Sequence, residues 1–426
     1  MVNNFTSGLY NISFFNMKID TSEELTNEVI KKEESTFIHE FIHYLQDLIL
    51  PYNIRVNLSN VRWLFNILEE AYKKGTIKRP FEDWNNESSI LWTQFNNTFG
   101  HGNFIDKVAY INNITSDYDN IEGYDSNLNV VRRHRVYKYT LDVVEDAELQ
   151  HSETYYLGAR DLLEYIAYKI ESKFFPDRPA APQLPYESVD LIFDSYGLAD
   201  ISDEIKICIA ERCLYNDAPV HCLLYVLLSD NKFKDFIRNS SYKDIYAFLL
   251  NSSTLTRDGY SEELNAKTQR RIHQFKNELQ IRYGSFEEIS KWLSMVSEFV
   301  KNNLSGKFIF SDIYKMNSDD MHKFVNDVIN QVGIPLIMNE QEKYISMCPE
   351  HIQKSGFIQF YVSQKFMDFL FNNKETKCPI YGFCKANGGS CNENCVLNNN
   401  GIIMGNESCH YRKFIETYRL TGIKID

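Results

Sequence analysis

Two histidines and a glutamate occur at a spacing that suits a metal ion. If the segment His39-Glu40-Phe41-Ile42-His43 is helical, both histidines lie on one face, one turn apart. Imidazoles in that arrangement can bind one Zn²⁺ ion, and Glu40 projects beside the ion without binding it. There it can take a proton from a water whose pKa the metal lowers to about 7, and later give one to a leaving amine. The pattern predicts a catalytic zinc ion with Glu40 as general base.

The motif lies near the end of a predicted core helix. Helical spacing begins at a capping-box pattern at Thr21 and Glu24, continues to Leu50 and stops at Pro51. Residues 9–19, before it, have the composition of a strand. Histidines on an apolar helix need buried polar partners, and two core histidines beside a chance glutamate are the alternative. The positions around the motif are apolar: Phe37, Ile38, Phe41, Ile42 and Leu45.

A second predicted helix, at about 157–174, carries a candidate third ligand. Together the two segments resemble the zincin metallopeptidases, and more closely the glutamate-liganded branch that includes thermolysin and neprilysin. In that branch a downstream helix donates a glutamate, often followed three positions later by a small residue; Glu164 and Ala167 match this pattern. The resemblance implies that Glu164 completes the zinc site and that Asp161 or Glu171 hydrogen-bonds a metal-bound histidine.

The resemblance covers about 60 residues and departs from the family pattern in two places. About 120 residues separate His43 from Glu164, and Tyr168 replaces the acidic residue common four positions after the glutamate ligand. His151 and Glu153 are competing third ligands. The strand at 129–141 could bind an extended substrate along its edge. Candidates for stabilising the oxyanion are Tyr155, Tyr156, His134 and Arg135.

Five of the nine cysteines lie within 32 residues near the end of the sequence. Thiolates this close together, in a segment rich in Asn and Gly, suit a structural Zn²⁺ ion that folds the segment. Disulfides or free thiols are one alternative, and an iron–sulfur cluster, which also uses four cysteines, is the other. The preferred ligands are Cys378, Cys384, Cys391 and Cys395, with Cys409 or His410 able to replace one.

Composition limits the classes of partner. The net charge is −13, from 45 basic and 58 acidic residues, which disfavours nucleic acid and anionic membrane. No apolar stretch is long enough to span a bilayer, and the first residues lack the features of a signal peptide. Dispersed thiols fit a reducing compartment. We therefore expect a cytoplasmic protein with a protein or peptide substrate and no membrane partner.

The expected fold class is α+β, predominantly helical, with a zincin-like catalytic domain, a helical C-terminal half and a small Cys-rich tail. Four of the ten prolines fall within 176–185 and mark a linker. The expected units are a metallopeptidase domain at 1–175 with an insert at 55–150, the linker at 176–185, a mainly helical domain at 186–375, and a Cys-rich metal-binding module at 376–426.

Two functional hypotheses follow. In the first, the chain is a zinc metallopeptidase that hydrolyses peptide bonds of a protein substrate, and its C-terminal half binds a regulatory partner. In the second, both metal sites are structural and the chain is a non-catalytic interaction module. A catalytic site keeps an open coordination position, whereas a structural site is closed.

Overall fold

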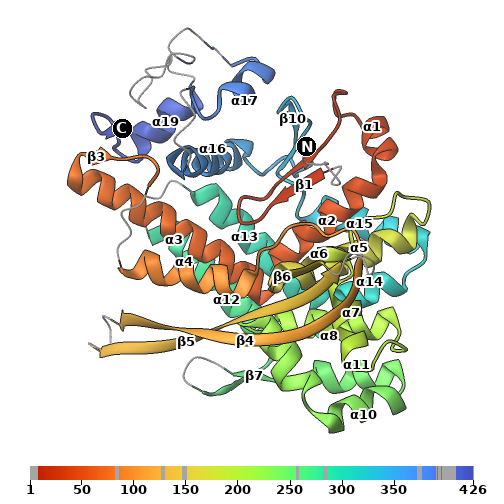
Figure 1. Ribbon diagram of the computed structural model, residues 1–426. Helices are drawn as coiled ribbons and strands as arrows, with labels where there is room; N and C mark the ends of the chain where they lie inside the picture. Colours follow the sequence, from red (N-terminus) through yellow and green to blue (C-terminus); the bar gives the residue numbers. More distant parts are fainter. Residues whose placement is uncertain are drawn as a thin grey trace.

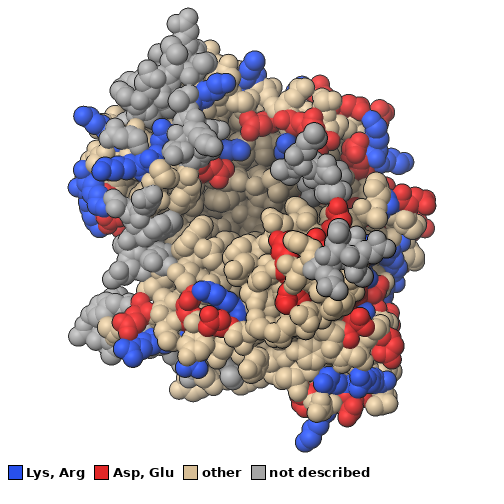
Figure 2. All heavy atoms as spheres, in the orientation of Figure 1, with Lys and Arg blue, Asp and Glu red and all other residues tan. Residues whose placement is uncertain are grey.

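The computed structural model describes residues 8–81, 86–125, 130–145, 151–255, 259–281, 286–371, 377–389, 391, 395 and 409–425. The fold is mixed α and β and predominantly helical, as predicted (Figure 1). No helix in these ranges is both long and apolar enough to cross a membrane. Figure 2 shows that one face of the molecule is hollowed near its centre, and uncharged residues line most of the hollow.

The chain begins with a β-hairpin, β1 (Gly8–Asn11) and β2 (Asn16–Ile19), which pair antiparallel. The prediction of one continuous strand at 9–19 is therefore wrong. The chain reverses in between, where Ser13 and Phe15 have φ angles of 78° and 51°. Neither residue type favours positive φ, and the turn contains no glycine or proline to mark it in the sequence.

The helix that carries the metal motif starts later than its capping-box pattern predicts. Thr26, not Thr21, caps the first helix, its side chain accepting a hydrogen bond from the Val29 amide at 3.3 Å. That helix is α1 (Asn27–Lys32), and α2 (Glu34–Ile49) follows it. The predicted stop before Pro51 is confirmed, because Pro51 begins the next helix, where its missing N–H costs nothing.

The predicted insert is built from one long helix, a shorter helix and an antiparallel three-stranded sheet in the order β4-β5-β6. The predicted helix at 157–174 is confirmed as α5. The elements are α3 (Pro51–Lys74), α4 (Asn86–Phe99), β4 (Val108–Asp125), β5 (Val130–Glu145), β6 (His151–Leu157) and α5 (Ala159–Phe174).

The segment that follows is helical. It contains α6 (Gln183–Tyr186), α7 (Ser188–Ser195), α8 (Asp203–Leu214), α9 (Pro219–His221), η1 (Cys222–Leu228), α10 (Asn231–Asn239), α11 (Tyr242–Leu250), α12 (Leu264–Ile281), α13 (Glu287–Phe299), η2 (Val300–Leu304), α14 (Ile309–Lys315) and α15 (Ser318–Gln331). The remaining elements are β9 (Leu336–Met338), β10 (Tyr344–Ile345), α16 (Lys354–Phe371), α17 (Tyr381–Ala386), α19 (His410–Thr417) and the short strands β3 (Thr76–Ile77), β7 (Thr254–Leu255), β8 (Ser261–Glu262) and β11 (Lys424–Ile425).

Segments from both sides of the proline-rich stretch at 176–185 share one sheet. Its order is β1-β2-β9-β10, and β2 pairs parallel with β9. Strand β11, near the end of the chain, pairs parallel with β3. One continuous hydrophobic cluster includes residues from all of these segments. The metal helix therefore packs in a core to which distant parts of the chain contribute.

Buried Asp47 attaches the N-terminal hairpin to the metal helix. Its Oδ2 accepts hydrogen bonds from the Tyr10 hydroxyl (3.0 Å) and the Ser13 amide (2.8 Å), and its Oδ1 accepts one from the Asn53 side-chain amide (3.1 Å). Because Asp47 is on α2 and Tyr10 is on β1, these bonds fix the edge of the sheet over the helix. Buried groups joined in this way are costly to separate.

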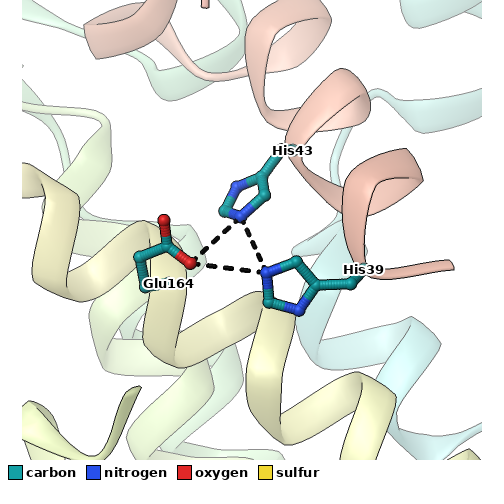
Figure 3. Close-up of side chains that lie close together, drawn as sticks. All are labelled: His39, His43 and Glu164. Atoms are coloured by element: carbon teal, nitrogen blue, oxygen red, sulfur yellow. Dashed lines mark hydrogen bonds and ion pairs between the residues drawn. The ribbon is translucent and has the colours of Figure 1, made fainter. Parts of the chain in front are cut away.

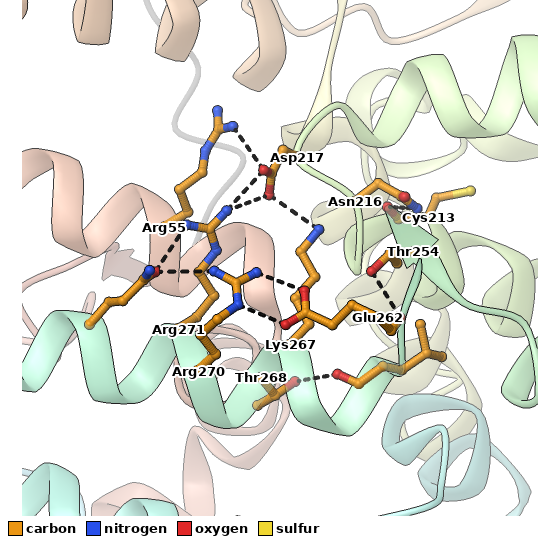
Figure 4. Close-up of polar contacts among 12 residues, drawn as sticks. Arg55, Cys213, Asn216, Asp217, Thr254, Glu262, Lys267, Thr268, Arg270 and Arg271 are labelled. Atoms are coloured by element: carbon orange, nitrogen blue, oxygen red, sulfur yellow. Dashed lines mark hydrogen bonds and ion pairs between the residues drawn. The ribbon is translucent and has the colours of Figure 1, made fainter. Parts of the chain in front are cut away.

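An ion cluster joins α3 to the helical half of the molecule (Figure 4). Asp217, after α8, contacts Arg271 (2.9 Å) and Lys267 (3.4 Å) of α12 and Arg55 of α3 (3.7 Å). Burial alone would raise the pKa of Asp217, but the three positive charges outweigh it and hold the pKa well below its ordinary value. On the same helix α12, the Thr268 hydroxyl donates to the carbonyl of Ile49, at the end of the metal helix, at 3.2 Å.

Replacing Asp47 with alanine leaves three donors without their acceptor. We expect Asp47→Ala to lower the free energy of unfolding by about 2–4 kcal/mol, measured by thermal unfolding. Exposed Asp235, which has only an ion pair to Arg238 at 3.7 Å, supplies the control, and Asp235→Ala should change stability by less than about 0.5 kcal/mol. Equal effects of the two substitutions would contradict the role of Asp47.

The Asp217 cluster predicts a pH-dependent stability. Because the folded pKa lies below the unfolded value of about 3.9, the stabilisation is present above that pH and is lost as the pH falls towards the folded pKa. The Asp217 side chain is 42% exposed, so water screens the attraction, and we expect Asp217→Asn to cost about 1–2 kcal/mol at pH 7. The difference in melting temperature from wild type should narrow between pH 7 and pH 3; a constant difference would contradict the assignment.

Candidate metal centre

Three side chains from two helices converge on one point (Figure 3). His39 and His43 extend from α2, and Glu164 faces them from α5. The two Nε2 atoms are 3.1 Å apart, and Oε2 of Glu164 lies 3.2 Å from Nε2 of His43 and 3.4 Å from Nε2 of His39. Among the described residues, one group of three or more His, Cys, Asp or Glu side chains could hold a metal ion. It consists of these three, whose ligand atoms all lie within 4.8 Å of one another. The structure thus brings together residues that lie 121 positions apart.

The outer nitrogen of each imidazole is bonded to an acceptor. Nδ1 of His39 lies 2.9 Å from Oε2 of Glu171, and Nδ1 of His43 lies 2.8 Å from Oε1 of Gln46. The Gln46 amide is oriented by its other end, where Nε2 donates to the Leu163 carbonyl at 3.0 Å. We therefore assign a proton to each Nδ1, which leaves each Nε2 with a lone pair directed at the convergence point.

Glu171 is itself held by several partners. The Ser35 hydroxyl donates to Oε1 at 2.5 Å, and Arg178 forms an ion pair with Oε2. Arg178 belongs to the proline-rich stretch, so this segment packs against the metal centre. Of the two residues expected to support a histidine, Glu171 does so. Asp161 instead accepts hydrogen bonds from the Gly158 amide and the Tyr155 hydroxyl at the start of α5.

Zn²⁺ fits the three converging atoms. Zinc–nitrogen bonds of 2.0–2.1 Å in a tetrahedron place ligand atoms about 3.3 Å apart, and the observed separations are 3.1, 3.2 and 3.4 Å. Two lone pairs and a carboxylate oxygen at these distances repel one another unless a positive charge lies between them, either a bound cation or a proton. Burial alone would lower the pKa of His43, but the Glu164 carboxylate outweighs burial and raises it. With three protein ligands, a tetrahedral ion keeps one open position, which is typical of catalytic zinc.

The two glutamates of the site have opposite electrostatic environments. Burial alone would raise the pKa of Glu164, but His43 and His39 outweigh burial and hold it well below its ordinary value, so this carboxylate stays ionised. Burial raises the pKa of Glu40 to about 7, although both histidines oppose the shift. A carboxyl group with a pKa near 7 can both accept and donate a proton at neutral pH.

Strand β1 passes directly over Glu40. A Cβ atom added at Gly8 would lie 2.7 Å from Oε1 of Glu40 and 2.7 Å from Cγ2 of Thr36. Only glycine allows this approach of the backbone to the Glu40 carboxyl group. The Asp47 bonds that hold β1 therefore also determine what lies next to the candidate general base.

The competing ligands lie elsewhere. His151 and Glu153 are on β6; the His151 side chain is 65% exposed, with Glu145 at 3.9 Å, and Glu153 accepts a bond from Asn103 at 3.4 Å. Neither belongs to the convergent group. The structure therefore favours Glu164 as third ligand.

The proposed oxyanion donors do not gather at the site. The Tyr155 hydroxyl is bonded to Asp161, Tyr156 stacks on His101 with ring centroids 4.5 Å apart, and Arg135 lies over the Tyr118 ring. The side chain of His134 lies outside the described residues.

Tyr186 is the aromatic residue beside the metal centre that the sequence did not single out. Its ring centroid is 6.0 Å from that of His39. Burial, and then the nearby charges of Glu164 and Glu40, raise the pKa of its phenol above the ordinary value, so the hydroxyl keeps its proton and can donate it. The chain reaches this position through the proline-rich stretch, and no local motif identifies it.

The C-terminal cysteines form a second cluster. Cys378, Cys384, Cys391, Cys395 and Cys409 all line one cavity of ≈ 210 Å³, and His410 lines it as well. None of the nine cysteines forms a disulfide. The predicted grouping is therefore present, with Cys409 as a fifth member.

Comparison of the chain with protein-family models, curated proteins and solved structures returned no match. The functional argument therefore depends on the geometry of the site.

If Gln46 orients the His43 ring through a hydrogen bond to Nδ1, replacing Gln46 should weaken zinc binding without unfolding the chain. We expect Gln46→Ala, like Glu171→Ala at His39, to reduce zinc affinity about 10- to 100-fold. Competition with a chromophoric chelator measures the affinity. Gln269→Ala, which removes two hydrogen bonds with Ser297, should retain wild-type affinity. Unchanged affinity in both site variants would contradict the assigned tautomers.

Proposed function

We propose that this chain is a zinc-dependent peptidase that hydrolyses peptide bonds in a protein or peptide substrate. The observation that supports it best is the convergence of His39, His43 and Glu164 at zinc-ligand distances. The buried carboxyl group of Glu40 lies on the same helix turn. A closed structural site has four protein ligands and no need of such a carboxyl group. The resemblance to the glutamate-liganded zincins agrees with this proposal.

Zinc, when bound, would supply an acidified water and polarise the substrate carbonyl. The chain's own residues would do the rest. Glu164 remains anionic and contributes one negative charge to the ligand set, while Glu171 and Gln46 keep the histidines in the ligating tautomer. Glu40 would accept the proton of the attacking water and pass it to the leaving nitrogen.

Among the residues considered, Tyr186 is the best candidate for donating a hydrogen bond to the carbonyl oxygen on which negative charge develops. Burial, and then two nearby carboxylates, raise the pKa of its phenol, and its ring packs beside His39. Phe104 stacks on the other side of Tyr186 with centroids 6.2 Å apart, and Arg160 covers Phe104. This wall restricts how Tyr186 can move, which favours a donor fixed in place.

The test of the proposal is Glu40→Gln, which keeps the size of the side chain and removes its basicity. We expect kcat/KM to fall at least about 100-fold with zinc content unchanged. A proteome-derived peptide mixture analysed by mass spectrometry serves as the substrate. Glu34→Gln is the matched control, because Glu34 begins the same helix but does not belong to the triad. Its Oε1 lies 2.7 Å from Nε2 of His322.

Cleavage undiminished in Glu40→Gln would refute the peptidase proposal. If wild-type protein loaded with zinc cleaves no peptide in the mixture, the result would likewise favour a metal-stabilised interaction module.

A further inference from the structure

Two described helices supply part of the wall of the cysteine cavity. Cys384 is on α17, Cys378 precedes that helix, and Cys409 caps α19, its sulfur accepting from the Arg412 amide at 3.4 Å. The Cys378 amide donates to the Cys395 carbonyl at 3.0 Å. The cavity therefore gathers thiols from four places along the chain.

The walls of the cavity are attached to the rest of the molecule. Asn387 accepts a bond from the Tyr344 amide at 3.1 Å and donates to the Glu342 carbonyl at 2.8 Å. The Gln359 side chain of α16 donates to the His410 carbonyl at 3.2 Å. These bonds fix both helices that carry cysteines, so the width of the cavity is a property of the fold.

The separation of the sulfurs bears on which metal they can hold. Four sulfurs around one Zn²⁺ ion, with bonds of about 2.3 Å, lie about 3.8 Å from one another. The histidine site meets such a requirement, since its three ligand atoms lie within 4.8 Å. The cysteines do not join any comparably tight group among the described residues, although all five line one cavity of ≈ 210 Å³.

An iron–sulfur core fits this arrangement better than a single ion. In a [4Fe–4S] cluster each cysteine binds a different iron, so the sulfurs surround the whole core and lie farther apart than around zinc. Thiolates are also the ligands that such clusters use. The cavity supplies both the thiolates and the room.

Burial separates four of the five cysteines from the fifth. Cys378 and Cys395 are buried, Cys384 and Cys409 are half-buried, and Cys391 is exposed. Burial, and then the nearby thiolates of Cys384, Cys409 and Cys395, raise the pKa of Cys378 to about 12. The four less exposed sulfurs are therefore the ones that can surround a group inside the cavity.

We infer that Cys378, Cys384, Cys395 and Cys409 bind a [4Fe–4S] cluster, with Cys391 outside the ligand set. This differs from the sequence-based preference in both metal and ligands, because spacing along the chain did not show the size of the cavity or the position of Cys409. The cluster would join α17 to α19 and so hold β11 against β3 near the end of α3. The inference is independent of the peptidase proposal.

The test is the metal and sulfide content of the full chain purified without oxygen from iron-supplied cells. We expect about four iron and four acid-labile sulfide per chain, with a broad visible absorption that bleaches on reduction with dithionite. Cys384→Ser should lose the iron and sulfide. Cys391→Ser and the remote control Cys348→Ser should keep them, and so should His39→Ala/His43→Ala.

Zinc bound by the cysteines without sulfide would overturn the inference, as would full alkylation of these thiols in protein that carries no iron. Loss of iron in Cys391→Ser but not in Cys409→Ser would overturn the ligand set. Should Cys384→Ser fail to fold, the stoichiometry of the wild-type chain still decides the metal.

Discussion

The arrangement of the metal centre follows from one electrostatic constraint. Two imidazole lone pairs and a carboxylate oxygen point at one another from 3.1 to 3.4 Å, an arrangement that is unfavourable without a positive charge at its centre. Hydrogen bonds from Nδ1 to Glu171 and Gln46 prevent the rings from relieving the repulsion by changing tautomer. The fold thus favours a positive charge at the point where the three atoms converge. The chemistry that we propose requires that charge to be a bound metal cation.

The surrounding structure keeps this unfavourable arrangement in place. Asp47 attaches β1 to the metal helix and brings Gly8 against Glu40. Thr268, on α12, donates a hydrogen bond to the carbonyl of Ile49 at the end of that helix. Arg178, in the proline-rich stretch, forms an ion pair with Glu171. Each contact comes from a different part of the sequence. The helical half of the chain therefore supports the site, and its size need not imply a separate activity.

Local patterns in the sequence predicted the convergence of His39, His43 and Glu164 and missed most of what surrounds it. The helical period placed His39 and His43 on one face. Glu164 was singled out through the resemblance to the glutamate-liganded zincins, in which a downstream helix donates a glutamate. Gln46 was missed because a glutamine three residues after a histidine is not distinctive. The turn at Ser13 contains no glycine or proline, and the parallel pairing of β2 with β9 joins positions more than 300 residues apart. Such contacts depend on tertiary packing, which no window of sequence contains.

The most direct test of the account is zinc content, measured by inductively coupled plasma mass spectrometry on wild type and on His39→Ala/His43→Ala. Both proteins should be prepared in parallel and compared by circular dichroism, so that a loss of metal is not a loss of fold. The variant should carry one zinc ion per chain fewer than wild type. If the folded variant retains as much zinc as wild type, the two histidines are not ligands, and the metal centre and the peptidase proposal are both contradicted.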